Sequence, residues 1–255
     1  MRFCCLGSGS SGNSTVIECS NKKTTILVDC GLRYSDLRER LTSQSLDVSN
    51  INAVFITHEH IDHIRSAATL AKNLNLPVYM THGCYFNSYQ EFKKINSLKF
   101  FRAEQPLCLN GIKVLPFSIP HDAREPIGLI FDDEKNKLGI LTDAGFITPH
   151  MIDILKNLDG LILEFNYDKT LLKNGNYPKS LKKRILSDLG HLSNDSAEFL
   201  LNKIFHPEMK VIVAAHLSKE NNRPNLVELR LNNFKNYFLK KIIADQKQPT
   251  GWVSL

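Results

Sequence analysis

Three histidines and two acids stand within the short stretch from His58 to His63, in the sequence HEHIDH. Neutral imidazoles and carboxylates are costly to bury unless each finds a partner, and Zn²⁺ and related cations take histidine nitrogen and carboxylate oxygen as ligands. The stretch directly follows the apolar run 53–57, so it leaves a buried strand at a turn. There His58 and His60 can reach one cation, while Asp62 and His63 reach a neighbouring one. We therefore interpret it as a metal-binding motif rather than as a polar surface loop.

Further histidines and acids follow apolar segments elsewhere in the chain. Asp29, Asp143 and His216 end the runs TTILVD, GILTD and VIVAAH. His121 follows an apolar segment and Ser-Ile-Pro, and His191 lies in Gly-His-Leu-Ser-Asn. Polar residues on turns at strand ends are common functional positions. Singly, such an aspartate more often caps a helix and such a histidine is more often structural, but together with the HEHIDH motif they favour a site for two metal ions.

The elements that must position these residues are short apolar segments alternating with amphipathic ones. Strands are predicted over residues 2–6, 14–18, 24–29, 53–57, 78–80, 112–117, 127–131, 138–142, 160–163, 211–214 and 241–244, with a turn at 21–23. Helices are predicted over residues 34–41, 66–74, 146–155, 178–187, 194–204 and 225–232. Two sheets with helices outside would bury so many apolar strands on both faces. No long linker interrupts the pattern, so we predict one domain over residues 1–255.

Composition excludes several classes of protein. With 255 residues, 42% hydrophobic and 23% charged, the chain is neither disordered nor collagen-like, and no apolar run approaches the ~20 residues of a membrane-spanning helix. The N-terminal residues do not form a signal peptide, so we expect a cytoplasmic protein without a membrane partner. In that compartment the six cysteines are best interpreted as buried thiols. The net charge of +6 permits a polyanionic partner without showing one.

The order of these residues resembles the metallo-β-lactamase superfamily of binuclear hydrolases, over essentially the whole chain. The resemblance implies an α/β fold, an αββα four-layer sandwich of two mixed β-sheets flanked by helices. It assigns one metal to His58, His60 and His121, and the other to Asp62, His63 and His216. Asp143 would bridge the two metals, and Asp29 would accept hydrogen bonds from the metal-binding histidines and fix their tautomer.

Finer motifs resemble the bacterial YycJ/WalJ group. These motifs are Gly-Ser-Gly-Ser-Ser-Gly-Asn-Ser at 7–14, His-Asp-Ala at 121–123, Gly-His-Leu-Ser-Asn at 190–194 and His-Leu-Ser-Lys-Glu-Asn-Asn at 216–222. That group implies a DNA 5′-to-3′ exonuclease, a phosphodiesterase that uses a metal-bound hydroxide. The expected partner is therefore DNA, and the expected cofactors are two divalent ions, Zn²⁺ or Mn²⁺, with Fe²⁺ also compatible with these ligands.

Catalytic roles are expected for Asp62, Glu164 and His191. The segment with Glu164 and His191 also resembles the tRNA 3′-processing endonucleases, in which a glutamate and a histidine pair beside the metals and assist proton transfer. Imidazole titrates near neutrality, which suits a general acid. The alternative is that His191 only caps the helix that begins at Ser193–Asn194.

Substrate contacts are expected from Ser10, Ser11, Asn13, Ser193 and Lys219. The Gly/Ser loop offers backbone N–H groups and hydroxyls, as a phosphate cradle does, although a flexible turn between strands explains it nearly as well. The basic segment 179–184 either guides a DNA backbone or is simply a solvated helix face.

The resemblance also excludes some relatives and leaves others open. The segment between Asp143 and His216 is too short for the inserted domain of the β-CASP nucleases. Position 60 is His, where the oxygen-reducing di-iron relatives carry Glu, which favours hydrolysis over redox chemistry. A ribonuclease remains an alternative, as does a small-molecule hydrolase that cleaves a thioester, a lactone or a cyclic phosphodiester.

Overall fold

The computed structural model describes residues 1–20, 24–236 and 238–255, and it contains two seven-stranded sheets. The predicted turn at 21–23 lies outside the described residues. The first sheet has the order β14-β1-β2-β3-β4-β5-β6. Its strands are β1 (Arg2–Gly7), β2 (Ser14–Glu18), β3 (Thr25–Val28), β4 (Ala53–Phe55), β5 (Val78–Thr81), β6 (Leu98–Phe101) and β14 (Val253–Ser254). Strands β1, β2, β3 and β14 pair antiparallel and β3 to β6 pair parallel, so the sheet is mixed.

The second sheet has the order β13-β12-β11-β10-β9-β8-β7 and is also mixed. Its strands are β7 (Leu107–Leu109), β8 (Ile112–Ser118), β9 (Ile127–Asp132), β10 (Lys137–Leu141), β11 (Gly160–Glu164), β12 (Val211–Ala215) and β13 (Lys240–Ile243). Strands β7 to β10 pair antiparallel, and β10 to β13 pair parallel. The carboxyl ends of the parallel strands therefore all lie at the same end of the sheet.

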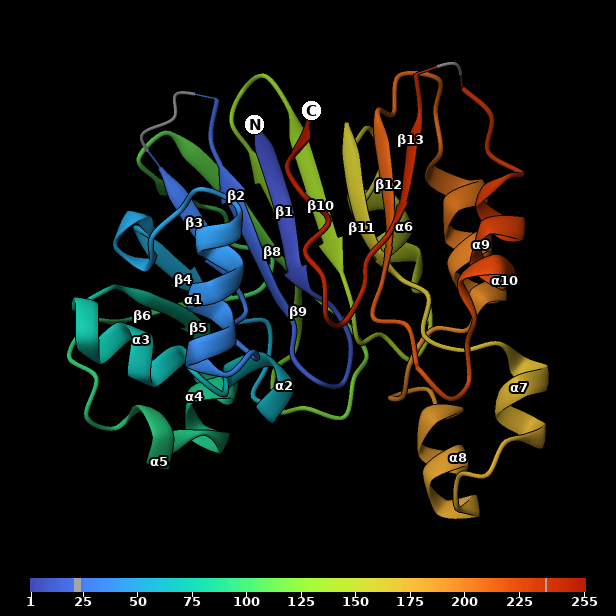
Figure 1. Cartoon of the computed structure of the whole chain (residues 1–255), viewed down its shortest axis with the longest axis horizontal. Helices are drawn as coiled ribbons and strands as arrows, with labels where there is room; N and C mark the ends of the chain where they lie inside the picture. Colours follow the sequence, from blue (N-terminus) through green and yellow to red (C-terminus); the bar gives the residue numbers. More distant parts are fainter. Residues whose placement is uncertain (21–23, 237) are drawn as a thin grey trace.

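Helices cover the outer faces of both sheets (Figure 1). On the first sheet they are α1 (Tyr34–Ser43), α3 (Ala67–Leu74), α4 (His82–Asn87) and α5 (Tyr89–Phe92), with the 3₁₀ turn η1 (Val48–Asn50). The short helix α2 (Ile61–Ile64) lies at the lower end of the strands instead. On the second sheet they are α6 (Pro149–Ile154), α9 (Asn194–Ile204) and α10 (Pro224–Leu231). Helices α7 (Lys169–Asn174) and α8 (Lys179–Ile185) extend past the lower edge of the second sheet in Figure 1.

The strands are apolar on both faces because successive side chains point to opposite sides of the sheet and both sides are buried. In β1, Phe3 and Cys5 point into the layer between the sheets, while Cys4 and Leu6 pack under α1 and α3. On the other side, the outer face of the second sheet packs against α6, α9 and α10. Strands buried on both faces read as continuous hydrophobic runs. The predicted αββα sandwich is therefore confirmed.

Aromatic packing joins the two sheets. Phe55 of β4 stacks on Tyr79 with ring centroids 4.6 Å apart, and it meets Phe131 of β9 edge to face at 5.9 Å. This contact ties the strand before the HEHIDH motif to the opposite sheet. Rigid strands on both sides of the site are what allows it to be held in one geometry.

Several short elements were not predicted from the sequence. They are β6, β7, β14, α2, α4, α5 and α7, none longer than six residues. Elements this short have too few residues to show a period, and tertiary contacts decide them. Within the part of the chain that the structure describes, no helix is long and apolar enough to cross a membrane.

Candidate metal centre

The site residues lie where strands end. Asp29 follows β3, the HEHIDH motif follows β4, Asp143 follows β10 and His216 follows β12. Asp29, Asp143 and His216 have φ values of 57°, 60° and 56°, in the left-handed region that non-glycine residues rarely adopt. Strained backbone of this kind persists only where its surroundings over-determine it, and it is concentrated at functional sites. With this backbone, Asp143 Oδ1 lies 3.1 Å from His216 Nδ1, and Asp29 Oδ2 lies 2.8 Å from His63 Nδ1.

Three histidines form the first group. His58 Nε2 lies 3.1 Å from His60 Nδ1, and His121 Nε2 lies 3.2 Å from the same atom. Two nitrogens that each lie ~2.05 Å from a tetrahedral cation are about 3.3 Å apart. The spacing of these ring nitrogens therefore fits a metal ion that binds all three.

A second group lies beside the first. The potential ligand atoms of Asp62, His63 and His216 lie within 4.8 Å of one another. Asp143 faces both groups, because its carboxylate clusters with His58 and His63 as well as with His216. Asp143 Oδ2 is 3.2 Å from His63 Nε2. The sequence-predicted ligands are thus brought together in two adjacent sets that share one carboxylate.

Two atoms of the candidate ligands are buried without a hydrogen bond. Among the described residues, Asp143 Oδ2 and His216 Nε2 have no hydrogen-bond partner. Leaving such atoms unpaired costs about 1–3 kcal/mol each, and more for a charged group. Both atoms belong to the ligand set, so a divalent cation is the partner that this donor set fits.

Hydrogen bonds behind the histidines fix their tautomers. His63 Nδ1 lies 2.8 Å from Asp29 Oδ2, and His121 Nδ1 lies 3.1 Å from the carbonyl oxygen of Gly190. Donation from each Nδ1 leaves Nε2 free to face the site. Asp29 is itself held by the backbone N–H of Thr57, which donates to its Oδ1 at 2.9 Å.

Glu164, the last residue of β11, joins two further histidines. Its Oε1 lies 2.9 Å from His191 Nδ1 and 2.9 Å from His216 Nδ1. Its Oε2 accepts from the backbone N–H groups of Ala144 at 3.1 Å and Leu192 at 2.9 Å. The carboxylate is fully buried, yet four donors compensate for its lost hydration. The structure thus brings Glu164 and His191 together as a pair.

Burial and neighbouring charges move the pKa values in opposite directions. Burial and the adjacent His63 lower the pKa of His58 well below its usual value, so the His58 imidazole is neutral. Burial alone would lower the pKa of His216, but Asp143, Asp62 and Glu164 outweigh it and raise this pKa to about 10. In the absence of a cation the carboxylates therefore hold protons on the imidazoles, and a bound metal would displace them.

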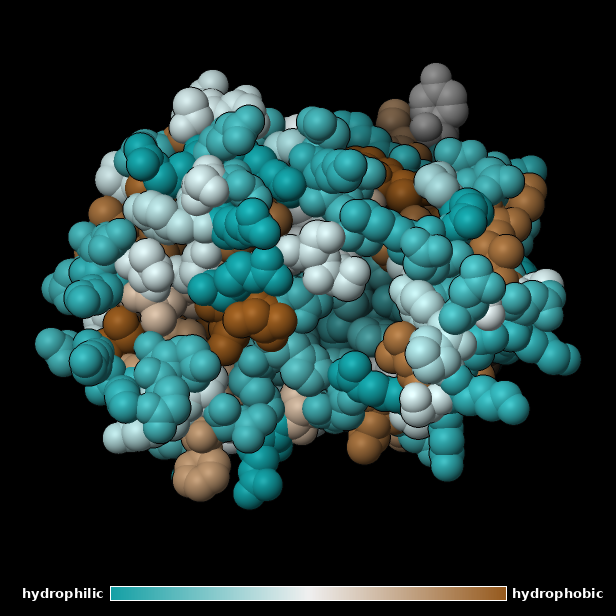
Figure 2. Space-filling model, turned by 60° about the horizontal axis from the view of Figure 1, so that its bottom comes forward, coloured by the Kyte–Doolittle hydropathy of each residue, from teal (hydrophilic) through white to brown (hydrophobic). Residues whose placement is uncertain are grey.

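A cavity of about 420 Å³ opens onto these residues. The space-filling view in Figure 2 shows this lower face of the molecule hollowed near its centre and lined mainly by hydrophilic residues. Ser10, His60 and His191 line the cavity, and Tyr177 and Leu181 from the α8 region form an apolar wall. The site is therefore open to a ligand on one side.

The other predicted substrate contacts Ser11, Asn13 and Ser193 are not in the lining of this cavity. Asn13 is buried and its Nδ2 lies 3.0 Å from His63 Nε2, so its side chain is directed at the candidate metal residues. The Ser11 hydroxyl donates to Gln246 Oε1 at 2.9 Å. Ser193 is buried, and its Oγ caps α9 by accepting from the N–H of Ser196 at 3.1 Å. Because Ser193 is the cap, the His191 side chain is not needed for that role.

Lys219 lies outside this cavity and lines a neighbouring one. The basic face of α8 contributes Arg184, whose NH2 donates to Asp122 Oδ1 at 3.1 Å. Asp122 Oδ1 in turn lies 3.5 Å from His121 Nε2.

Sequence reasoning missed two polar residues beside the ligands. Asp122 was not singled out as a site residue, although its position directly after His121 was a usable signal. Asn166 donates from Nδ2 to the carbonyl oxygen of His216 at 2.9 Å and supports its strained backbone. Nothing in the local sequence around Asn166 marks it.

Comparisons with known proteins agree with this geometry. Residues 24–214 match the beta-lactamase superfamily domain. The chain belongs to the metallo-β-lactamase superfamily and is a metal-dependent hydrolase. Within that class it is similar to exodeoxyribonuclease YycJ of Bacillus anthracis, with 32% identity over 91% of this chain and 88% of the relative. It is also similar to exodeoxyribonuclease WalJ of Streptococcus pneumoniae, with 34% identity over 91% of this chain and 87% of the relative.

Solved structures share the fold at lower identity. The metallo-beta-lactamase fold protein YhfI from Bacillus subtilis has a TM-score of 0.75 and 19% identity, over 97% of this chain and 98% of that one. Zn²⁺-bound PqqB from Methylobacterium extorquens has a TM-score of 0.75 and 14% identity, over 100% of both chains. These likenesses establish the fold.

Proposed function

We propose that the chain is a binuclear metal-dependent phosphodiesterase that degrades DNA from the 5′ end. The observation that carries the proposal is Asp143, a buried carboxylate that faces two adjacent groups of ligand atoms at once. The similarity to the YycJ and WalJ exodeoxyribonucleases over most of both chains supports DNA as the substrate. We further propose a single domain over residues 1–255 without a β-CASP insertion.

Ligand roles follow the two groups. His58, His60 and His121 would hold one ion, Asp62, His63 and His216 would hold the other, and Asp143 would contact both. Zn²⁺ or Mn²⁺ suits this set of nitrogen and oxygen ligands, and Fe²⁺ is also compatible with it. Two such ions supply Lewis acidity, which makes water a nucleophile at neutral pH and offsets charge on a phosphodiester.

Asp29 acts as a positioning residue. Its carboxylate accepts from His63 Nδ1 and is held by Thr57, so the ring cannot rotate away from the site. Glu164 does the same for His216. Burial alone would raise the pKa of Asp62, but the adjacent His216 and His63 outweigh it and lower this pKa, so the carboxylate is ionised and ready to bind a cation.

Proton transfer to the leaving oxygen is assigned to His191. Burial alone would lower its pKa, but the adjacent Glu164 outweighs this effect and raises it, which favours the protonated ring that a general acid requires. With Nδ1 bound to Glu164, Nε2 is the nitrogen from which a proton can leave toward the cavity. When the proton has left, the carboxylate still holds the ring in place through Nδ1.

Substrate contacts are assigned to Ser10, Ser11, Asn13, Ser193 and Lys219. Ser10 lines the cavity, and Lys219 lies on a loop shared with its wall. Asn13 and Ser11 hold the glycine-rich loop against His63 and Gln246 and would act through that loop. Ser193 would act through the start of α9, which its hydroxyl caps.

The test uses metal-quantified protein with DNA and RNA, single- and double-stranded, labelled at the 5′ or the 3′ end. Stepwise, metal-dependent loss of DNA from the 5′ end is expected, and it should vanish in the chelated protein and in Asp143→Ala. Asp153→Ala, an exposed aspartate of α6, is the matched control and should retain activity. Full metal occupancy without cleavage of any nucleic acid would overturn the proposal.

Two alternatives give distinct results in the same experiment. A ribonuclease would degrade only the RNA strands, because it requires the 2′-hydroxyl. A hydrolase of thioesters, lactones or cyclic phosphodiesters would bind metal and cleave no polymer at all.

A further inference from the structure

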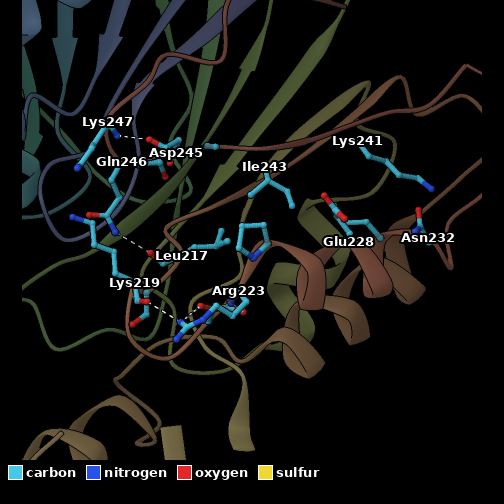
Figure 3. Close-up of a pocket in the computed structure, with 16 residues that line it drawn as sticks. Leu217, Lys219, Arg223, Glu228, Asn232, Lys241, Ile243, Asp245, Gln246 and Lys247 are labelled. Atoms are coloured by element: carbon cyan, nitrogen blue, oxygen red, sulfur yellow. Dashed lines mark hydrogen bonds between the residues drawn. The ribbon is translucent and has the colours of Figure 1, made fainter. Parts of the chain in front are cut away.

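A second cavity of about 670 Å³ adjoins the metal site (Figure 3). It is formed by the loop after β12, one side of α10 and the segment 241–247, and we call it the C-terminal pocket. Its volume falls within the range of about 300–1,000 Å³ that is typical of small-ligand sites. None of the metal-ligand side chains lines it.

The C-terminal pocket shares a wall with the metal-site cavity. Leu217 and Ser218 line both cavities. The backbone N–H of His216 donates to Ser8 Oγ at 2.7 Å, and Gln246 Nε2 donates to the carbonyl oxygen of Leu217 at 3.0 Å. Ser8 and Gln246 also line the C-terminal pocket. A substrate strand that extends from the metal site past His216 would therefore enter this pocket next.

Chemistry varies along the C-terminal pocket. Lys219 and Lys247 lie at one end, together with Gln246, and Leu217 and Ile243 lie in the middle (Figure 3). Among the described residues, neither of these two lysines has a carboxylate within 4.0 Å, so both charges are available to a ligand. The other end carries Lys241 together with polar groups.

Those polar groups are Glu228 and Asn232, which lie near Lys241 in Figure 3. Their side chains can hydrogen-bond to a polar ring edge. Asp245 also lines the pocket, and its Oδ1 accepts from the backbone N–H groups of Lys247 and Gln248 at 2.6 and 3.0 Å. Lys219 and Lys247 at one end, an apolar middle and hydrogen-bonding groups beside Lys241 at the other end match a phosphate, a base face and a base edge.

We propose that the C-terminal pocket is a nucleotide subsite that binds one nucleotide of the substrate strand beside the metal site. The phosphate lies between Lys219 and Lys247, and the base packs on Leu217 and Ile243. This inference rests on the proposed function, because it takes nucleic acid as the substrate. The subsite would bind the strand without regard to base identity, since every base has an apolar face that can pack on these side chains.

Photo-crosslinking tests the position directly. Thymidine hexamers with phosphorothioate linkages and one 4-thiothymidine, moved through each position in turn, are irradiated with the metal-loaded protein. Crosslinks from one or two adjacent positions are expected in the segments 217–223 or 243–247. Crosslinks that map only to other segments, such as 177–185, would overturn the subsite.

Kinetics on a thymidine oligomer provide a second readout. Ile243→Asp and Lys247→Glu should each raise KM about 10-fold while kcat changes less than twofold. The matched controls are Leu229→Asp and Lys240→Glu, exposed positions of α10 and β13 outside the pocket lining, and they should stay within twofold in both parameters. Unchanged KM in both pocket variants would contradict the proposal.

Salt dependence separates a phosphate contact from a merely structural role. On a single strand, losing one phosphate contact makes the negative slope of log affinity against log salt less steep by about 0.7. Lys247→Glu should show this loss, whereas Ile243→Asp should not, because Ile243 carries no charge. An unchanged slope for Lys247→Glu would refute the phosphate assignment.

Failure of the subsite and failure of the proposed function give different results. A wild type that degrades DNA, but shows no crosslink in the pocket and no KM change in the variants, refutes the subsite alone. A wild type that crosslinks in the pocket, but degrades no DNA, refutes the proposed function while the pocket still binds a nucleotide.

Discussion

Replacing Glu164 by Gln should weaken metal binding through a change of tautomer at His216. The carboxylate accepts from two backbone N–H groups, those of Ala144 and Leu192, and from two imidazoles, those of His191 and His216. An amide has only one oxygen, and backbone N–H groups cannot change their polarity. The amide oxygen must therefore face the backbone, and the NH₂ group must face the two Nδ1 atoms.

The size of the loss in metal affinity follows from the mismatch between the amide NH₂ group and the His216 tautomer that binds metal. With an NH₂ group opposite, His216 Nδ1 loses its carboxylate acceptor on Glu164, which favours the tautomer with the proton on Nε2, the atom directed at Asp62 and free of any hydrogen bond among the described residues. To bind a metal through Nε2, the ring must return to its first tautomer and leave two donors facing each other. An unpaired buried donor costs about 1–3 kcal/mol. Because 1.4 kcal/mol corresponds to a factor of ten, the metal Kd should rise about 10–100-fold, in line with other residues that orient metal ligands.

The assay is Zn²⁺ competition with a chromophoric chelator, combined with nitrogen NMR of the His216 ring. One of the two sites should weaken, and the spectrum of the apo variant should show the proton on Nε2. Glu18→Gln is the matched control, since Glu18 is a buried carboxylate of β2 that pairs with Arg2 and touches no histidine. Unchanged affinity at both sites, or an Nδ1–H tautomer in the variant, would refute the reasoning.

Other expectations concern stability. Phe55→Ala should lower the free energy of unfolding by about 3–5 kcal/mol in urea titrations, because it empties a fully buried aromatic position between the sheets; Phe86→Ala, at a position 74% exposed, should change it by less than about 1 kcal/mol. Burial alone would raise the pKa of Asp133, but hydrogen bonds from Ser20 and from the N–H of Asn136 outweigh it and lower this pKa to about 2. An aspartate whose pKa is lower in the folded protein than in the unfolded chain, where it is ~3.9, stabilises the fold at pH values above ~3.9. Asp133→Asn should therefore cost about 1 kcal/mol at pH 7, a difference that shrinks as pH falls from 4 to 2; a constant difference would contradict this account. Chelation should lower the melting temperature of the wild type, since metal at 100 times its Kd contributes about 2.7 kcal/mol, and it should leave Asp143→Ala nearly unchanged when both are followed by circular dichroism.

Much of the fold was predictable because its strands are buried on both faces. The segments 53–57, 160–163 and 211–214 are continuous apolar runs, and the structure forms β4, β11 and β12 there. Short elements such as α2 and β14 were not predictable, because they have too few residues to show a period. Helix α2 begins inside the HEHIDH motif, where the sequence indicated only a turn.

Candidate metal ligands were marked in the sequence by residue type, but the atoms facing the site were not. His60 presents Nδ1 to the other two histidines, while His58 and His121 present Nε2. The Glu164–His191 pair was expected from the resemblance to the tRNA 3′-processing endonucleases, and the structure adds that the same carboxylate also holds His216. No spacing rule connects residues from three different elements.

The sequence by itself therefore determined the layered fold, the HEHIDH motif and the class of chemistry, because apolar periodicity and ligand types are local properties. Only the tertiary structure decided how Asp29, Asp143 and His216 converge, since this requires strand ends from two sheets and left-handed backbone at each of the three positions. It also decided the C-terminal pocket, whose walls come from segments on both sides of α10. Which side chains share a cavity is set by the packing of distant segments, and no local pattern encodes it.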